Sequence, residues 1–125
     1  MEIKSAKDLF VYKKAYELAM DIFRLSKRFP SEEKFSLTSQ IRRSSRSVCH
    51  NLREAWAKRR YEAHFVSKLT DCDGENSETD TSLDLALDCE CITQDKHSIL
   101  TARNAEIGRM LGSMINEPEK FLLKL

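Results

Sequence analysis

Glycine and proline are scarce in this chain, with 3 Gly and 2 Pro among 125 residues. So few turn-forming residues exclude a collagen-like repeat and a turn-rich all-β domain. Apolar residues make up 41% and charged residues 33% of the sequence, which excludes a disordered chain. The length is that of one domain, whose folding would bury roughly two-thirds of the unfolded surface. The composition therefore predicts a single helical domain over residues 1–125.

Long apolar runs and targeting signals are also missing. No apolar run approaches the roughly 18 residues of a membrane-spanning helix, and the start MEIKSAKDLF lacks the apolar stretch of a signal peptide. The four cysteines, Cys49, Cys72, Cys89 and Cys91, have no C-x-x-C spacing. We therefore expect reduced thiols, no metal site and a cytoplasmic protein that makes no contact with a membrane.

Sequence patterns of catalysis are absent as well. A di-metal helical bundle needs Glu-x-x-His pairs, and none of His50, His64 and His97 follows a Glu at that spacing. The acids around Gly74 resemble a calcium loop, but Ser82 stands where its closing Glu belongs. There is no Gly-rich phosphate loop. We expect no catalytic residues, no cofactor and no small-molecule substrate.

The net charge of +1 conceals two opposed blocks. Residues 1–68 hold 16 Lys and Arg against 8 Asp and Glu, whereas residues 69–95 hold 9 acids and no base. Residues 96–125 add 5 bases and 3 acids. A near-neutral total therefore does not exclude a nucleic-acid partner.

Helical spacing of apolar residues predicts four helices, at about 7–28, 32–60, 61–92 and 95–115. The second helix begins either at Glu32 or at Thr38. Short connections between these segments predict an all-α, antiparallel up-down-up-down four-helix bundle. The C-terminal tail, residues 118–125, is apolar and either docks on the bundle or covers a neighbouring subunit.

The third predicted helix contains a long polar stretch. Between Thr70 and Ser82 its only apolar residue is Cys72, which is typical of a loop. However, one row advances by three or four residues at every step through this stretch: Phe65, Leu69, Cys72, Asn76, Thr79, Leu83 and Ala86. We predict one long helix with a polar middle and an unfavourable Gly74. Two short helices around an acidic loop remain the alternative.

Basic residues gather on the second helix, roughly opposite its apolar row. The candidate nucleic-acid-binding residues are Arg42, Arg43, Arg46, Arg53, Lys58, Arg59 and Arg60. Contact with RNA or DNA phosphates needs only clustered cations. The plainer interpretation is that these residues pair with the acids of the third helix, within one subunit or between subunits. Any claim of nucleic-acid binding must first exclude such pairing.

Several stretches resemble one protein family. Asp8–Ala15 (DLFVYKKA), Phe29-Pro30 and Phe35–Arg43 (FSLTSQIRR) are similar to the small bacterial four-helix-bundle proteins, also called the 23S rRNA intervening-sequence protein family. The similarity continues through Ser47-Val48 and ends at Ile107–Leu111 (IGRML), so that it spans most of the chain.

This resemblance implies an up-down-up-down bundle that assembles into a homopentamer and has no enzymatic activity. Some family members are encoded inside insertions of 23S ribosomal RNA genes, and a related group serves as accessory proteins of retroelement reverse transcriptases. The implied partners are therefore further copies of this chain and RNA or DNA. From the aromatic and apolar residues we expect the subunit interface to include Tyr12, Tyr16, Trp56, Phe121 and Leu122.

The chain departs from the family pattern at three places. Ala55 replaces the glycine that would end the second helix, which leaves open whether the basic row extends to Arg60. Cys72 stands where Ala is usual, and Glu90-Cys91 replaces a glycine and an aromatic residue. Two functions remain open, a nucleic-acid-associated oligomer and an interaction scaffold whose opposed charges hold subunits together.

Overall fold

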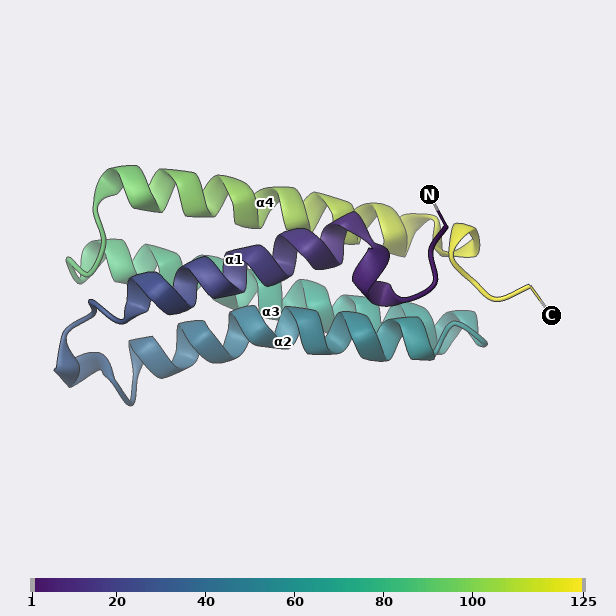
Figure 1. The fold of residues 1–125 in the computed structure, drawn as a ribbon, viewed down its shortest axis with the longest axis horizontal. Coiled ribbons are helices and arrows are strands. Elements are labelled where there is room, and N and C mark those ends of the chain that lie inside the picture. The colour runs from purple at the N-terminus through teal and green to yellow at the C-terminus, as the bar shows by residue number, and fades with distance from the viewer. Residues whose placement is uncertain (1, 125) are drawn as a thin grey trace.

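The computed structural model describes residues 2–124, which form four α-helices and three short 3-10 turns. The helices are α1 (Phe10–Ser26), α2 (Leu37–Ala57), α3 (Glu62–Asp88) and α4 (Gln94–Asn116). The 3-10 turns are η1 (Ala6–Asp8), η2 (Ser31–Glu33) and η3 (Pro118–Lys120). Successive helices run in opposite directions, and both termini lie at one end of the molecule (Figure 1). The predicted all-α, up-down-up-down bundle is confirmed.

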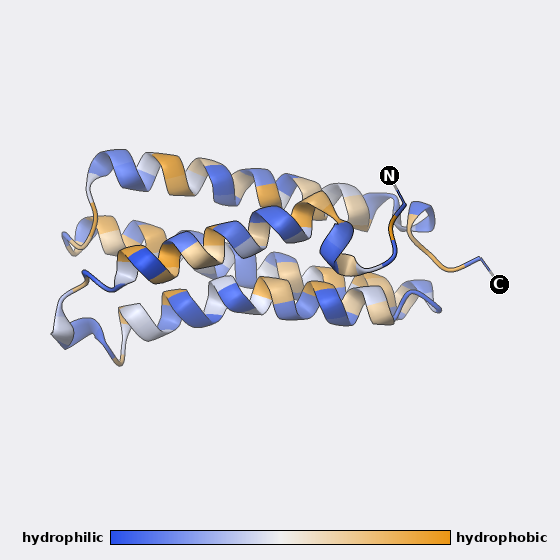
Figure 2. Cartoon of the chain, in the orientation of Figure 1, coloured by the Kyte–Doolittle hydropathy of each residue, from blue (hydrophilic) through white to orange (hydrophobic). Residues whose placement is uncertain are grey.

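The helices form a square arrangement around one core. α2 packs against α1 and α3, and α4 packs against α3 and α1. The contact between α1 and α4 is the least extensive of the four. Hydrophobic residues recur along every helix and are not gathered into one run (Figure 2). No helix within residues 2–124 combines the length and the apolar character that crossing a membrane requires.

The third helix is continuous from Glu62 to Asp88, so the alternative with an acidic loop is wrong. Every member of the predicted row is buried, including the polar Asn76 and Thr79. Asn76 Nδ2 donates to Asn104 Oδ1 on α4 at 2.9 Å, and Asn104 Nδ2 donates to the Asn76 carbonyl at 2.9 Å. Thr79 Oγ1 donates to Ser44 Oγ on α2 at 2.8 Å. The polar middle of α3 is therefore part of the core, because its buried polar side chains form hydrogen bonds with side chains of α2 and α4.

The ends of α1 and α2 differ from the prediction. α1 begins at Phe10, because Ser5 and Asp8 form a capping box that closes η1 and leaves Leu9 extended. α2 begins at Leu37, one residue before Thr38, the later of its two predicted starts. Residues 31–33 form a separate 3-10 turn. It ends at Ala57 and not at Arg60.

The turn after α2 is fixed by the C-terminal tail. The Leu123 N–H donates to the Arg59 carbonyl at 3.3 Å, and Phe121 packs against Phe65 with 6.4 Å between the ring centroids. Phe121 and Leu122 are half-buried against the core of their own chain. Of the two predicted roles of the tail, docking on its own bundle is the one that the structure has, while Leu125 lies outside the described residues.

α3 ends at Asp88, earlier than the predicted 92, in a Schellman motif. The Cys91 N–H donates to the Ala86 carbonyl at 2.8 Å, and the Glu90 N–H donates to the Leu87 carbonyl at 3.0 Å. Glu90 has a φ of 61°, the left-handed conformation that such a motif requires and that glycine adopts most easily. Thr93 then caps α4 by accepting a hydrogen bond from the Lys96 N–H at 3.2 Å.

Candidate nucleic-acid interface

The structure divides the predicted basic residues of α2 into three groups. Arg42, Arg46 and Arg53 lie at the edge of α2 that faces α1. Arg43 lies at the edge that faces α3, and Lys58, Arg59 and Arg60 lie in the turn after the helix. The sequence placed all of them on one face, because helical phase alone does not show which helix packs against each edge.

At the α1 edge, Arg42 and Arg46 are positioned by residues of α1. Arg42 Nε donates to Ser26 Oγ at 2.7 Å. The guanidinium carbons of Arg42 and Arg46 lie 4.8 and 5.5 Å from the centroid of the Phe23 ring. These cation–π contacts restrain both side chains and leave their terminal nitrogens available as donors.

Further along the same edge, Arg46 and Arg53 line a groove between α1 and α2 together with Tyr12, Tyr16 and His50. We name the surface formed by Arg42, Arg46 and Arg53 the α2 basic edge. Aromatic rings beside clustered arginines provide both stacking and phosphate contacts for a nucleic acid.

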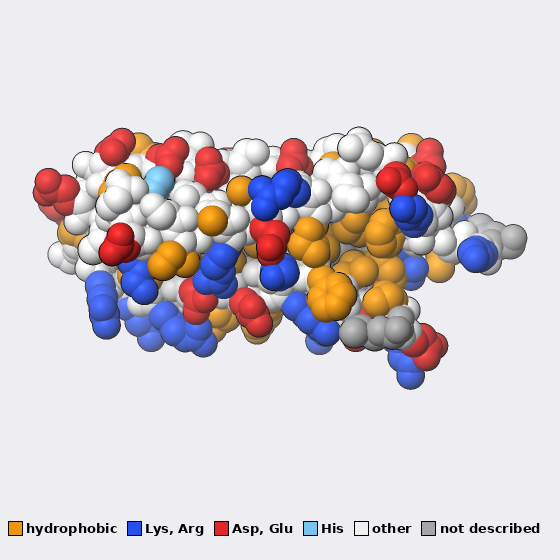
Figure 3. Space-filling view, turned by 90° about the horizontal axis from the view of Figure 1, so that it is seen from above, with side chains coloured by type: hydrophobic (Ala, Val, Ile, Leu, Met, Phe, Trp, Pro, Cys, Tyr) orange, Lys and Arg blue, Asp and Glu red, His pale blue; other side chains and the backbone are white. Residues whose placement is uncertain are grey.

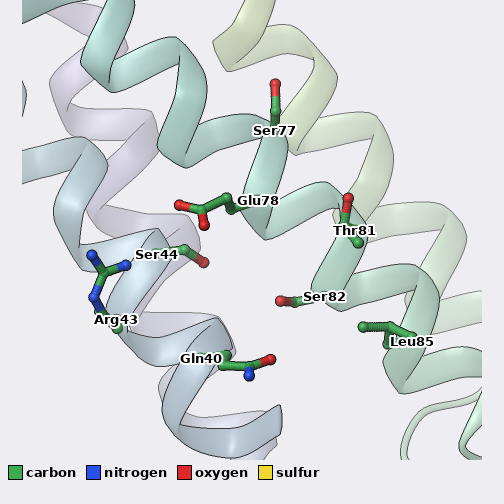
Figure 4. Close-up of a pocket in the computed structure, with 8 residues that line it drawn as sticks. All are labelled: Gln40, Arg43, Ser44, Ser77, Glu78, Thr81, Ser82 and Leu85. Carbon is green, nitrogen blue, oxygen red and sulfur yellow. The ribbon is translucent and has the colours of Figure 1, made fainter. Parts of the chain in front are cut away.

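Arg43 lies close to carboxylates of α3. Its Nη1 is 3.4 Å from Glu75 Oε2 of α3, whose pKa is raised by burial and by the neighbouring Glu78. Arg43 and Gln40 rise from α2, while Glu78 and Thr81 come from α3 on the other side of the same groove (Figure 4). The carboxylates make this groove a poor site for phosphate.

Arg59 has a structural role. Its guanidinium lies 3.6 Å from the centroid of the Trp56 ring, Nε donates to the Trp56 carbonyl at 2.8 Å, and Nη1 donates to the Phe121 carbonyl at 3.4 Å. Desolvation lowers the pKa of Arg59. The side chain thus joins the end of α2 to the tail, while Lys58 and Arg60 are exposed beside it.

Pairing between the two charge blocks is limited within one chain. Of the seven predicted basic residues, Arg43 alone has a carboxylate oxygen within 4.0 Å among residues 2–124. Elsewhere, Lys68 of α3 lies 3.0 Å from Glu54 and 3.1 Å from Asp71, and these contacts raise the pKa of Lys68. Intrachain pairing therefore does not account for the α2 basic edge.

Sequence reasoning missed a second group of bases, which lies where α1 meets α4. These residues are Arg24, Arg28, Lys96 and Arg103. The available signal was weak: Arg24 lies on α1 and Arg28 in the turn that follows it, and Lys96 and Arg103 are two turns apart on α4. Only the packing of α1 against α4 brings the two pairs together.

The predicted interface residues also separate. Tyr16 is 54% exposed, and its ring centroid is 6.1 Å from that of the half-buried Tyr12. Phe10, which the prediction did not include, is 62% exposed. Hydrophobic side chains gather on the half of the surface that holds the termini (Figure 3). Trp56, Phe121 and Leu122 instead pack partly against their own core.

The thiols of the core are poor nucleophiles and poor metal ligands. Burial raises the pKa of Cys49 to about 11 and that of Cys72 to about 12, so both thiols are protonated at neutral pH. Cys89 and Cys91 are free thiols at the turn between α3 and α4. Within residues 2–124 no three His, Cys, Asp or Glu side chains are grouped so that they could hold a metal ion.

Comparisons with known proteins agree with the fold. No curated protein matches the chain. A solved structure from Bacteroides thetaiotaomicron, described as a protein of unknown function from the S23 ribosomal protein family, is 34% identical to it. The match covers 85% of this chain and 95% of that one, with a TM-score of 0.78. The sequence model of the 23S rRNA-intervening sequence protein matches residues 7–113, and the chain therefore belongs to that family.

Proposed function

We propose that this protein is a non-enzymatic, homo-oligomeric nucleic-acid-contacting protein whose α2 basic edge binds phosphates of RNA or DNA. The observation that carries the proposal is that Arg42, Arg46 and Arg53 have no carboxylate within 4.0 Å in the described part of the chain. Arginine prefers charged oxygen partners, and clustered unpaired guanidiniums are what phosphate contact requires.

The arrangement of charge supports this choice of surface. α1 and α3 pack against opposite edges of α2, and the acid-rich segment belongs to α3. The α2 basic edge therefore faces away from the acids of its own chain. The membership of the chain in a family named after intervening sequences of 23S rRNA is consistent with RNA as the first nucleic acid to test.

Self-association is the second part of the proposal. Phe10 and Tyr16 are more than half exposed, and apolar side chains gathered on one part of a surface are typical of an interface. We propose a homo-oligomer, a pentamer by family resemblance, in the cytoplasm. The alternative function is a scaffold in which the α2 basic edge binds the acidic face of another copy and no nucleic acid takes part.

The test compares RNA binding by wild type and by the triple variant Arg42→Glu/Arg46→Glu/Arg53→Glu across a salt series. The matched control is Lys4→Glu/Arg109→Glu/Lys124→Glu, which makes the same change in charge at exposed bases elsewhere. We expect wild type to bind with an affinity that falls steeply with salt. Loss of three phosphate contacts makes the negative slope of log K against log salt less steep, by about 2 for single-stranded RNA.

Light scattering without RNA separates the two functions. The proposal expects the triple variant to lose RNA binding and to keep the mass of wild type. A smaller mass for the triple variant, together with no RNA binding by wild type at low salt, would establish the scaffold instead. The milder variant Arg42→Gln/Arg46→Gln/Arg53→Gln and a thermal melt show whether a loss of binding reflects misfolding.

A further inference from the structure

The C-terminal half of α1 has basic side chains on both of its flanks. On the α2 side these are Arg42 and Arg46, held against Phe23. On the α4 side, Arg24 of α1 and Arg28 of the turn after it share a groove with Lys96 and Arg103 of α4. This groove lies along the least extensive of the four helix contacts, and Arg24, Arg28 and Lys96 are exposed along it.

The carboxylates in the α1–α4 groove are too few for its bases. Asp21 is the one acid that lines it, and its two oxygens are 3.1 Å from Arg24 Nη1 and 2.8 Å from Arg103 Nη1. Arg28 and Lys96 have no carboxylate within 4.0 Å among residues 2–124. The groove therefore keeps a strong positive charge, with one acid for four bases.

The C-cap residue of α1, Lys27, adds a further base between the two flanks. Lys27 Nζ lies 4.8 Å from the centroid of the Phe23 ring, so that three cations surround this one ring. In the space-filling view, Lys and Arg side chains gather along the α1 edge of the half that is remote from the termini (Figure 3). Cations at the C-terminal end of α1 also stabilise its negative dipole end, which favours their clustering there.

The spacing of these bases suits a chain of phosphates better than a single small anion. At a rise of about 1.5 Å per residue, Lys96 and Arg103 are about 10 Å apart along α4. A row of bases over this length is too long for one small anion, and it can contact neighbouring phosphates of one strand.

We propose that the α1–α4 groove is a second phosphate-binding strip for the same nucleic acid, so that the backbone is bound across the C-terminal half of α1 and not along α2 alone. This inference rests on the proposed function. Arg28 and Lys96 make the direct phosphate contacts. Arg24 and Arg103 are held by Asp21 and contribute charge.

The experiment measures binding of a labelled single-stranded RNA oligonucleotide by fluorescence anisotropy across a salt series. The variant Arg28→Glu/Lys96→Glu is compared with the matched control Lys4→Glu/Lys124→Glu, which changes two exposed bases near the termini. Loss of two contacts makes the negative slope of log K against log salt less steep by about 1.4, and the control keeps the slope of wild type. The milder variant Arg28→Gln/Lys96→Gln lowers the slope by the same amount and guards against misfolding.

The outcomes separate this inference from the proposed function. If wild type binds RNA, and Arg42→Glu/Arg46→Glu/Arg53→Glu lowers the slope while Arg28→Glu/Lys96→Glu does not, the second strip is wrong and the proposed function stands. If wild type does not bind at low salt, the proposed function itself fails. A fall in the light-scattering mass of Arg28→Glu/Lys96→Glu without RNA would overturn the inference, because the groove would then bind another copy of the chain.

Discussion

Glu90 is the one non-glycine residue with a positive φ in the part of the chain that the structure describes. It holds the position in the Schellman motif of α3 where a Cβ opposes the left-handed conformation. We expect Glu90→Gly to raise the free energy of unfolding by about 1 kcal/mol, because glycine adopts this conformation without that steric penalty. Chemical denaturation measures the change. Glu90→Ala, which keeps the Cβ, is the control and should give no such gain.

The buried thiols predict how stability responds to alkaline pH. In the folded state the pKa of Cys49 is raised to about 11 and that of Cys72 to about 12, from 9.0 for a thiol in the unfolded chain. Above pH 9 the unfolded chain loses these protons while the folded chain keeps them, so the free energy of unfolding falls as pH rises. Each thiol contributes a slope of up to about 1.4 kcal/mol per pH unit between its two pKa values.

The measurement compares wild type with Cys49→Ala/Cys72→Ala between pH 8 and the folded-state pKa values, since other groups titrate in both proteins and cancel in the difference. The expected result is a shallower loss of stability in the variant. An identical pH dependence in the two proteins would show that these thiols are not desolvated. Native Cys89, which is exposed, should react with a thiol reagent at once, while Cys49 and Cys72 react only on unfolding.

At the scale of the helix, the three glycines lie in different surroundings. A Cβ at Gly108 of α4 would lie 3.0 Å from Asn76 Oδ1, whose amide is fixed by its hydrogen bonds to Asn104. A Cβ at Gly74 of α3 or Gly112 of α4 would meet nothing within 4 Å. We therefore expect Gly108→Ala to destabilise the bundle by about 1–2 kcal/mol through overpacking. Gly74→Ala and Gly112→Ala should each stabilise it by about 0.5–1 kcal/mol through helix propensity.

Thermal unfolding of the three variants checks this difference, and the open positions serve as controls for Gly108. A stabilised Gly108→Ala would mean that α3 and α4 separate easily at this point. It would also mean that the Asn76–Asn104 hydrogen bonds do not fix the register of the two helices.

The continuity of α3 could be predicted, because the row from Phe65 to Ala86 keeps its step of three or four residues through the polar stretch. The end of α2 could not be predicted as well, because contacts distant in sequence hold the turn that follows it. The Arg59 carbonyl accepts from the Leu123 N–H, and Arg59 also bonds the Phe121 carbonyl. No local pattern around residue 58 contains that information.

The candidate site was predicted in its residues and not in its shape. Helical phase placed Arg42, Arg46 and Arg53 on a common face. It did not show that α1 packs beside that face, nor that Phe23 lies against Arg42. The bases of α4 were missed for the same reason, since only packing brings Arg103 to Asp21 of α1 at 2.8 Å.

On the whole molecule, the separation of charge seen in the sequence becomes a separation of surfaces. The basic side chains border α1, and α1 and α3 lie diagonally across the bundle. A nucleic acid that approaches the basic surface is thus attracted by the near side and repelled by the acids of α3. Such repulsion acts over about 10 Å at 0.1 M salt and over longer distances at lower salt.

Neutralising part of the acidic face should therefore strengthen RNA binding without a new contact. Asp73 and Asp80 are exposed on α3, and neither has a basic partner within 4.0 Å among residues 2–124. We expect Asp73→Asn/Asp80→Asn to raise RNA affinity by about two- to five-fold at low salt, with little gain at high salt where the charges are screened. The control Glu2→Gln/Glu119→Gln removes the same charge near the termini, outside the acid-rich segment of α3, and should change affinity less. Light scattering decides the scaffold alternative in the same experiment, because an assembly held by these acids would lose mass in Asp73→Asn/Asp80→Asn, whereas phosphate binding by α1 and α2 leaves the mass unchanged.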